Sequence, residues 1–124
     1  AVTRRWQRVG LASAFYIKWK GRIAMKKIFI SQPMNGRTDE EIVRERELAI
    51  RRAKKAFGDD IEIIDSFFQG APADTKPLWY LAKSIEVMAQ ADGVFFAHGW
   101  EEARGCKIEY ECATKYGIPY YVCF

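Results

Sequence analysis

The chain has 124 residues, of which 49% are hydrophobic and 15% aromatic, a composition that excludes a disordered chain and fits one domain with a single core. No apolar run approaches the roughly 20 residues that cross a bilayer, so no membrane partner is expected. The three cysteines form no C-x-x-C pair, which argues against a disulfide framework or a zinc site and predicts a cytoplasmic protein.

The net charge of +4 comes from the first 24 residues, which contain six Lys or Arg and no acid. Residues 25–124 carry 14 basic and 16 acidic side chains, a net charge of −2. The domain itself is therefore not basic, and no nucleic-acid polymer is expected as a partner. Because Met25 opens the strand-like run MKKIFIS, we interpret residues 1–24 as a basic leader, derived from an expression vector or from translated upstream sequence.

The domain over 25–124 begins with a short β-branched strand at 27–31, KIFIS, followed by the polar turn QPMNG. Thr38 then offers a helix N-cap, and Glu41 three residues later completes a capping box. The helix predicted over 39–57 has one apolar stripe, and the sequence GDD ends it. This stripe consists of Ile42, Ala49, Ile50, Ala53 and Phe57.

A second strand, IEIID, is predicted at 61–65, and a long loop at 66–76 follows it. The next helix is predicted over about 77–90, with Pro77 in its first turn. Its inner face is expected to comprise Leu78, Leu81, Ile85 and Met88 or Ala89.

Two further strands and one helix complete the alternation. The run GVFFA predicts a strand at 93–97, a helix over 106–116 ends at Gly117, and the last strand covers 118–124. This β-α-β-α-β-α-β series predicts an α/β fold, a three-layer flavodoxin- or Rossmann-like parallel sheet of about four strands flanked by helices.

Ligands of such sheets bind beyond the carboxyl ends of the strands. This rule gathers the segments 31–36, 65–76 and 98–107 at one edge, whereas Asp92 falls at the opposite edge and is expected to be a structural cap. The loop SQPMNGRTDE matches neither G-x-G-x-x-G nor G-x-x-x-x-G-K-[ST], and no metal-ligand spacing is present. Neither a cofactor nor a metal is therefore expected.

Two glutamates in the stretch GCKIEYECA differ in their predicted surroundings. At 100° per residue, Glu111 shares a face with Lys107 and Lys115 and is an ordinary solvated charge. Glu109, in the first turn of the predicted helix, is either a carboxylate that stabilises the helix N-terminus or a desolvated group suited to nucleophilic attack. The apolar stripe predicted to include it consists of Ile108, Glu109, Cys112, Ala113 and Tyr116.

Other residues at the carboxyl edge are candidates for substrate binding. Ser31 and Asn35 suit a ribose hydroxyl or a phosphate, although Asn35-Gly36 also suits a simple turn. His98 has no paired Ser or Cys motif and is expected to line a pocket. Trp100 is interpreted either as a platform for base stacking or as a packed loop aromatic.

Three stretches, MKKIFISQPMNGRTDEEI, AQADGVFFAHGWEEARGCKIEYECA and YGIP, together resemble the nucleoside 2-deoxyribosyltransferase-like superfamily, in particular a small bacterial and phage branch. The resemblance covers residues 25–124. Its motifs are an S-x-P-M-x-G-like loop and a G-x-x-x-E-x-x-x-A helix start. In this chain they comprise Ser31, Pro33, Met34, Gly36, Gly105, Glu109 and Ala113.

The resemblance implies that Glu109 attacks C1′ of a nucleoside or nucleotide and forms a glycosyl-enzyme ester, which water or a second base resolves. It also implies a homo-oligomer, because superfamily members complete each active site with a neighbour's loop; the 18 aromatic side chains favour the same conclusion. The expected substrate-binding residues are Ser31, Pro33, Met34, Asn35, Gly36, Asp65, His98, Gly99, Trp100 and Gly105.

One position departs from the superfamily pattern. Ser84 stands where the transferases carry an acidic residue on the second helix, and Asp65 or Asp74 are the acids near the carboxyl edge that can replace it. Two functions follow from these observations. The chain is either a nucleoside or nucleotide glycosidase or deoxyribosyltransferase, or a non-catalytic nucleotide-binding or assembly module on the same fold.

Overall fold

The computed structural model describes residues 6–9, 17–19 and 22–123, with side chains from Met25 onward. Its main sheet has the strand order β1-β7-β6-β4-β5, and four of these strands are parallel. Taken in chain order, the parallel strands have the order 2-1-3-4, which confirms the predicted flavodoxin-like arrangement. They are β4 (Lys26–Ser31), β5 (Ile61–Ile63), β6 (Gly93–Phe96) and β7 (Tyr120–Cys123).

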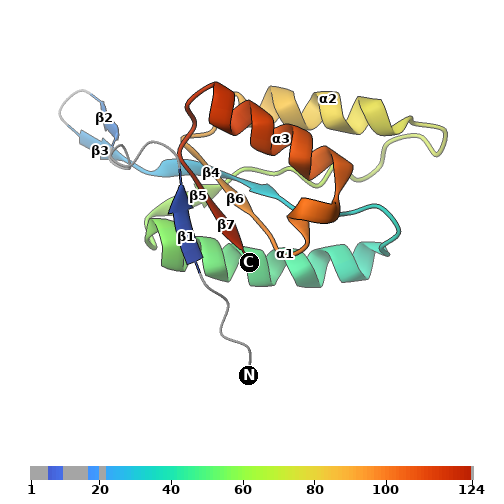
Figure 1. The fold of residues 1–124 in the computed structure, drawn as a ribbon, viewed down its shortest axis with the longest axis horizontal. Helices are drawn as coiled ribbons and strands as arrows, with labels where there is room; N and C mark the ends of the chain where they lie inside the picture. Colours follow the sequence, from blue (N-terminus) through green and yellow to red (C-terminus); the bar gives the residue numbers. More distant parts are fainter. Residues whose placement is uncertain (1–5, 10–16, 20–21, 124) are drawn as a thin grey trace.

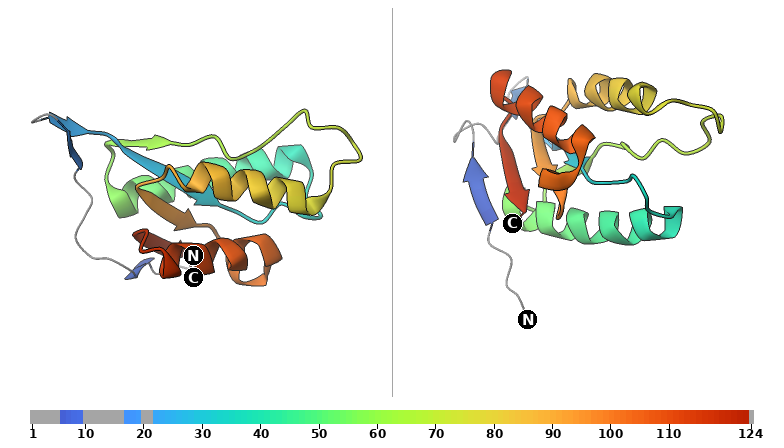
Figure 2. Two further views of the ribbon diagram at one scale, coloured as in Figure 1. Left: turned by 90° about the horizontal axis from the view of Figure 1, so that it is seen from above. Right: turned by 45° about the vertical axis from the view of Figure 1, so that its right-hand side comes forward.

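Three helices cover the two faces of the sheet (Figure 1). Helix α1 (Asp39–Phe57) lies on one face, and α2 (Pro77–Met88) and α3 (Arg104–Lys115) lie on the other, as the turned views also show (Figure 2). Within the described residues, no helix is long and apolar enough to span a membrane. The predicted three-layer α/β architecture is confirmed.

The central strand β4 divides the core by simple alternation. Ile28 and Ile30 pack in the cluster that contains α1, whereas Phe29 packs in the cluster on the side of α2 and α3. Ser31, the last residue of β4, follows the same alternation and faces α3. The sequence pattern of β4 therefore decides which helical layer receives the hydroxyl of Ser31.

Helix α1 has the residue limits that the sequence predicts. The Thr38 side chain accepts a hydrogen bond from the Glu41 backbone N–H, and the Glu41 side chain accepts one from the Thr38 N–H, which confirms the capping box. Gly58 ends the helix with a φ of 101°, a value that favours glycine. Four of the five predicted stripe residues are buried, and Ile50 is half-buried against them.

The face predicted for α2 is wrong at Leu78, which is 73% exposed. Leu81 and Ile85 are half-buried, and Met88 is buried. The helix begins beyond the ends of the strands, at the end of the loop over 66–76, so its first turn has no sheet beneath it (Figure 1). Hydrophobic periodicity correctly predicts which side of α2 faces the sheet. It does not predict how much of the helix the sheet covers.

Asp92 joins β4 at the amino edge of the sheet through two hydrogen bonds. Asp92 Oδ2 accepts a hydrogen bond of 2.7 Å from the Lys27 backbone N–H, and the Asp92 N–H donates to the Lys27 carbonyl at 2.7 Å. The prediction that Asp92 is a structural cap is therefore confirmed.

The first 24 residues contain strands that the sequence did not predict. β1 (Trp6–Val9) pairs antiparallel with β7, with Trp6 opposite Cys123. β2 (Ile17–Trp19) and β3 (Arg22–Ala24) form a separate two-stranded sheet. The origin of this segment stays a prediction.

Replacing Gly93 with alanine is expected to destabilise the fold, because the added Cβ would lie 2.7 Å from Phe57 Cε1 and 3.1 Å from Ile28 Cδ1. Overpacking of this kind costs about 1–3 kcal/mol. Gly105→Ala is the matched control, since its nearest atom is Leu81 Cδ1 at 4.0 Å and a helix favours alanine. Urea unfolding should show a loss for Gly93→Ala alone, and equal stability of that variant and the unmodified chain would contradict the packing argument.

Candidate functional site

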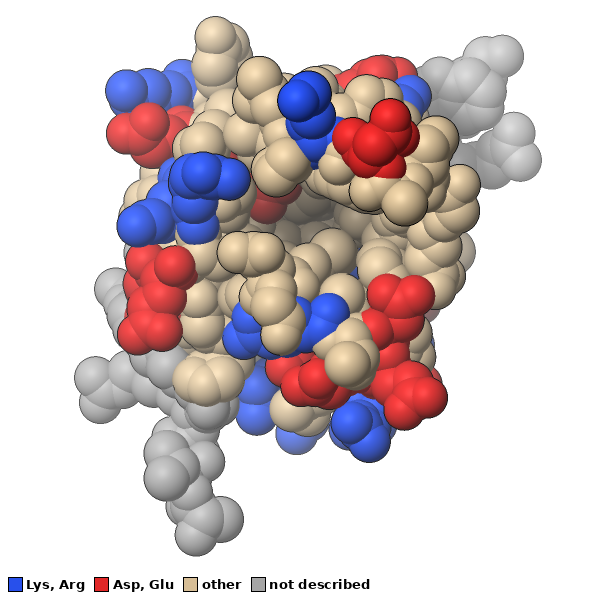
Figure 3. All heavy atoms as spheres, turned by 90° about the vertical axis from the view of Figure 1, so that its right-hand side faces the viewer, with Lys and Arg blue, Asp and Glu red and all other residues tan. Residues whose placement is uncertain are grey.

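The candidate site lies at the carboxyl edge between the adjacent strands β4 and β6, with Ser31 in register with Phe96. This is the topological switch point of the sheet, because the chain proceeds outward from β4 to β5 on one side and from β6 to β7 on the other. Seen from this edge, the molecule is hollowed, and acidic atoms are visible inside the hollow (Figure 3).

Glu109 is the one buried acidic side chain of the described residues, with 6% of its surface exposed. Ser31 Oγ donates a hydrogen bond of 2.6 Å to Glu109 Oε1. Glu111 is exposed, as the helical pattern predicts. Two of the residues expected at the site, from segments 78 positions apart, are therefore in direct contact.

The buried face of α3 consists of Cys106, Glu109 and Ala113, spaced i, i+3 and i+7. The predicted stripe is wrong for Ile108, which is 37% exposed, and for Tyr116, which is 84% exposed. Ile108 lies well off the centre of the observed face at 100° per residue. Tyr116 is the C-cap residue and falls beyond the last helical turn.

The helix-terminus interpretation of Glu109 is also wrong. Helix α3 begins at Arg104 rather than 106, so Glu109 is its sixth residue, and the first turn contains no acidic side chain. Because the effect of the helix dipole falls off within the first turn, it gives little stabilisation to this carboxyl.

Burial raises the pKa of Glu109 from its ordinary value of 4.5 to about 7. Hydrogen bonding from the hydroxyls of Ser31 and, to a smaller extent, Ser84 lowers this pKa but does not offset the loss of hydration. In the described part of the chain, no Lys or Arg forms an ion pair with Glu109. The carboxyl is thus buried with hydroxyl donors and without a compensating charge.

The thiol of Cys106 lies one helical turn before Glu109. Burial raises its pKa to about 12, and the charge of Glu109 acts in the same direction, whereas hydrogen bonding with Ser31 and the charge of Arg37 lower it. Cys106 is therefore a neutral thiol at physiological pH and a poor nucleophile. Sequence reasoning did not single out this residue, because a lone cysteine carries no motif.

The loop after β4 contributes a tight turn rather than a row of ligand-facing side chains. The Arg37 N–H donates to the Met34 carbonyl at 3.1 Å, and Gly36 has a φ of 78°. Asn35 and Gly36 are exposed at the tip, Met34 is half-buried, and Pro33 is buried. The turn interpretation of Asn35-Gly36 is confirmed.

The loop after β6 packs against this turn. A Cβ at Gly99, whose φ is 85°, would lie 3.5 Å from Pro33 Cγ and 3.9 Å from Arg37 Nη2. Arg37 Nε bonds Glu45 at 3.0 Å, which holds the guanidinium at the junction of the two loops. The sequence analysis did not include Arg37 among the site residues. Its position two residues before a helix that begins at the ligand edge could have indicated it.

Trp100, in the short 3-10 helix η1 (Trp100–Glu102), is half-buried and packs against the core cluster on the side of α2 and α3. Its ring stacks on Tyr110 with centroids 4.7 Å apart and contacts Phe96 at 5.4 Å. The packing interpretation therefore describes Trp100 better than the base-stacking one. His98 is exposed, and Gly105 is half-buried in the first turn of α3, facing Leu81.

Asp65 and Asp74, the acids expected to replace the acidic residue missing at Ser84, both lie on the surface. Asp65 is exposed, and its Oδ1 accepts a hydrogen bond of 3.2 Å from the Phe67 N–H within a local turn. Asp74 is also exposed. The half-buried Arg46 of α1 instead binds the segment that follows β5. It donates hydrogen bonds to the Ile64 carbonyl at 2.9 Å and to Ser66 Oγ at 3.0 Å.

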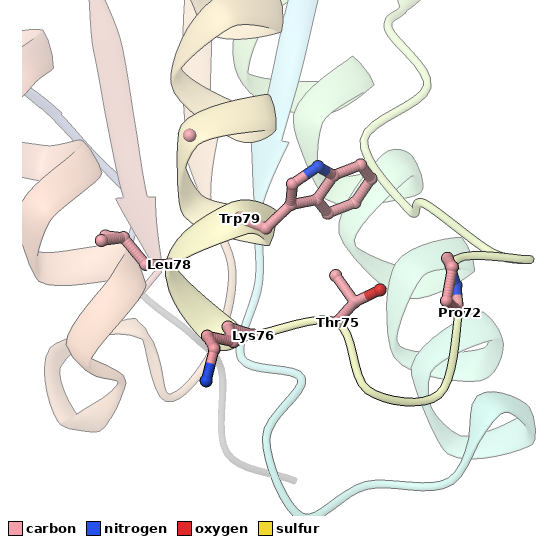
Figure 4. Close-up of a pocket in the computed structure, with 6 residues that line it drawn as sticks. Pro72, Thr75, Lys76, Leu78 and Trp79 are labelled. Carbon is pink, nitrogen blue, oxygen red and sulfur yellow. The ribbon is translucent and has the colours of Figure 1, made fainter.

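Within the described residues, no group of three or more His, Cys, Asp or Glu side chains is placed to hold a metal ion. An open apolar groove lies at the start of α2, and Glu109 is not part of its lining (Figure 4). Its lining residues are Pro72, Thr75, Lys76, Leu78, Trp79 and Ala82.

Residues 26–122 match the family model described as Domain of unknown function (DUF4406), and the chain belongs to this family. The comparisons with curated proteins and with solved structures gave no match. The match runs from the first residue of β4 to the last but one of β7, and it includes Ser31 and Glu109.

The raised pKa of Glu109 predicts a specific dependence of stability on pH. The folded state binds the carboxyl proton more tightly than the unfolded state, so the stability contributed by this group falls as the pH rises from about 4.5 to 7. Glu109→Gln is neutral at every pH, and its free energy of unfolding should exceed that of the unmodified chain by roughly 3 kcal/mol at pH 8 and approach it at pH 4.

Urea unfolding at the two pH values measures this difference. Glu111→Gln is the matched control, because Glu111 is exposed and the same substitution there should leave the pH dependence unchanged. Equal pH dependence of the two variants would show that Glu109 does not carry the raised pKa.

Proposed function

We propose that this member of the DUF4406 family cleaves or exchanges the N-glycosidic bond of a nucleoside or nucleotide, with Glu109 as the nucleophile. The observation that carries the proposal is the buried Glu109 carboxyl at the ligand edge of the sheet, held by Ser31 without a basic partner among the described residues. Such a group lowers the stability of the fold when ionised, and strongly perturbed carboxyls of this kind concentrate at functional sites.

In the proposed reaction, a carboxylate oxygen of Glu109 bonds to C1′ while the C1′–N bond breaks, and the electron pair of that bond leaves with the base. The product is a glycosyl ester on Glu109. Water or a second base then attacks C1′, the ester C–O bond breaks, and the Glu109 carboxylate is restored. Ser31 orients the carboxyl throughout by its hydrogen bond to Oε1.

The pKa of Glu109 suits this role. A nucleophilic carboxylate must be ionised, and a pKa of about 7 leaves roughly half of the molecules ionised at neutral pH. Limited hydration also favours attack, since little water has to leave the carboxylate before C1′ approaches. The hydrogen bond from Ser31 favours the charged form and so keeps part of the population active.

The resemblance to the nucleoside 2-deoxyribosyltransferase-like superfamily supports the same residue by an independent route. Its two motifs lie far apart in the sequence, one in the loop after β4 and one in α3, and Ser31 and Glu109 join them by a hydrogen bond. The glutamate in the superfamily motif is the residue that burial and charge single out. Ser84, at the position of the acidic residue, also contacts this carboxyl through its hydroxyl.

A single nucleoside or nucleotide is the expected substrate, rather than a polymer, since residues 25–124 have a net charge of −2. None of Cys106, Cys112 and Cys123 forms a disulfide. Cysteines without disulfides support a reducing, cytoplasmic setting for the reaction.

A non-catalytic nucleotide-binding or assembly module is the second candidate, and the exposed positions of Asp65 and Asp74 favour it. Neither acid is placed to protonate a departing base. Incubation with a panel of nucleosides and 5′-monophosphates distinguishes the two functions: released base supports the enzyme, and tight binding without release supports the module.

Glu109→Gln is expected to lower base release by three orders of magnitude or more, because the amide cannot form the glycosyl ester. Release is measured by chromatography of the free base from the same panel. Glu111→Gln, with an exposed side chain two residues away, should stay within about twofold of the unmodified rate. Full activity of Glu109→Gln would exclude it as the nucleophile.

Ser31→Ala is expected to move the pH–rate profile to higher pH, because the variant loses the hydrogen bond that most lowers the pKa of Glu109. Activity rises with pH as the carboxyl ionises, so the loss should be larger at pH 6 than at pH 9. Ser84→Ala should give a smaller shift in the same direction. An unchanged profile in Ser31→Ala would contradict the assigned role of its hydroxyl.

A further inference from the structure

Gln32 stands directly after Ser31 and is a buried polar residue, with 6% of its surface exposed. The strand β4 ends at Ser31, and Pro33 has no N–H with which to extend the strand pairing. The Gln32 side chain instead anchors this point of the chain to α1. Its Nε2 donates a hydrogen bond of 3.1 Å to the Ile42 carbonyl.

Arg46, also on α1, binds the same glutamine and the segment after β5. Its Nη1 donates to Gln32 Oε1 at 3.4 Å and to Ser66 Oγ at 3.0 Å. Its Nη2 donates to the Ile64 carbonyl at 2.9 Å. One guanidinium thus joins α1 both to the residue that follows β4 and to the segment that follows β5. We refer to Arg46, Gln32 and Ser66 together as the Arg46 clamp.

The Arg46 clamp holds the strand on both sides of Ser31. Ser66 is 3% exposed, and its Oγ donates to the Ile30 carbonyl at 3.2 Å. Ile30 and Gln32 flank Ser31 and contact the layer of α1, whereas Ser31 faces α3. The neighbours of Ser31 are therefore fixed from the face of the sheet opposite to Glu109.

We propose that Arg46 is a positioning residue, which acts on Glu109 through the Ser31 hydroxyl. Gln32 and Ser66 transmit the position of its guanidinium to the end of β4. The inference rests on the proposed function, which makes Glu109 the nucleophile.

The contact that the Arg46 clamp controls is sensitive to small movements. The hydrogen bond from Ser31 Oγ to Glu109 Oε1 is 2.6 Å long. A movement of the end of β4 by about 1 Å would lengthen it beyond the range of a hydrogen bond. Because the bond from Ser31 lowers the pKa of Glu109, its loss would raise that pKa further.

The clamp acts by position rather than by charge. Burial raises the pKa of Glu109, and the hydroxyls of Ser31 and Ser84 lower it, with no part from the charge of Arg46. Lysine at position 46 would therefore keep the charge and remove the geometry, since one ammonium group does not reproduce a planar fork of donors. This difference makes the role of Arg46 testable.

The pKa of Glu109 is measured in the full chain without substrate, by 13C NMR titration of the glutamate carboxyls, with Glu109→Gln to assign its resonance. Arg46→Lys is expected to raise this pKa by about half a pH unit or more, part of the rise that Ser31→Ala gives. Gln32→Met, which keeps the side chain's size but loses its hydrogen bonds, should also raise it. Arg51→Lys is the matched control, because Arg51 is exposed on the same helix.

A double variant separates positioning from a purely structural role. Because Arg46 acts through the Ser31 hydroxyl, Arg46→Lys should give no further rise in the pKa of Glu109 when Ser31→Ala is already present. An unchanged pKa in Arg46→Lys, or the same rise with and without the Ser31 hydroxyl, would overturn the proposal. Gln32→Met decides the same two outcomes if Arg46→Lys does not fold.

The titration and the base-release assay give separate answers. A raised pKa in Arg46→Lys, with no base released by the unmodified chain, would support the Arg46 clamp and reject the proposed reaction. If base is released, the pH–rate profile of Arg46→Lys should move to higher pH, with a larger loss of activity at pH 6 than at pH 9. Base release with an unmoved pKa and profile would support the reaction and overturn the positioning role.

Discussion

The site depends on the hydrogen bond by which Ser31, at the end of β4, holds the Glu109 carboxyl inside the layer of α2 and α3. A buried carboxylate loses its hydration, and hydroxyl donors replace only part of it, so the pKa ends near 7 rather than below 4.5. The contact requires the alternation of β4, which puts Ser31 on the side of Phe29. A shift of β4 by one residue would turn Ser31 toward α1 and remove the main donor to Glu109.

The sequence was informative wherever a rule of chain geometry applies. Alternating strand and helix patterns force a parallel sheet, and the carboxyl ends of its strands must meet at one edge. That rule places Ser31 and the start of the helix that contains Glu109 at the same edge of the sheet. Helical periodicity separated Glu109 from Glu111, because two residues apart on a helix means nearly opposite faces.

What the sequence left open or missed has a common cause, which is that periodicity describes one element and not what covers it. Leu78 fits the apolar face of α2, but the sheet ends before it does. Trp100 is packed by Tyr110, which no local pattern connects to it. The approach of Ser84 to Glu109 likewise depends on how α2 and α3 lie together on one face. The strand β1 depends on pairing with β7 at the far end of the chain.

Under the proposed reaction, the surroundings of Glu109 restrict the departing base. Its neighbours are the hydroxyls of Ser31 and Ser84 and the thiol of Cys106, whose pKa is raised to about 12. None of these is a strong enough acid to protonate a leaving group at neutral pH. The proton then comes from solvent, and a base that leaves as a stabilised anion suits this site better than one that needs a general acid. The absence of a second inward carboxyl in the described residues, more than the nucleophile itself, therefore narrows the class of substrate.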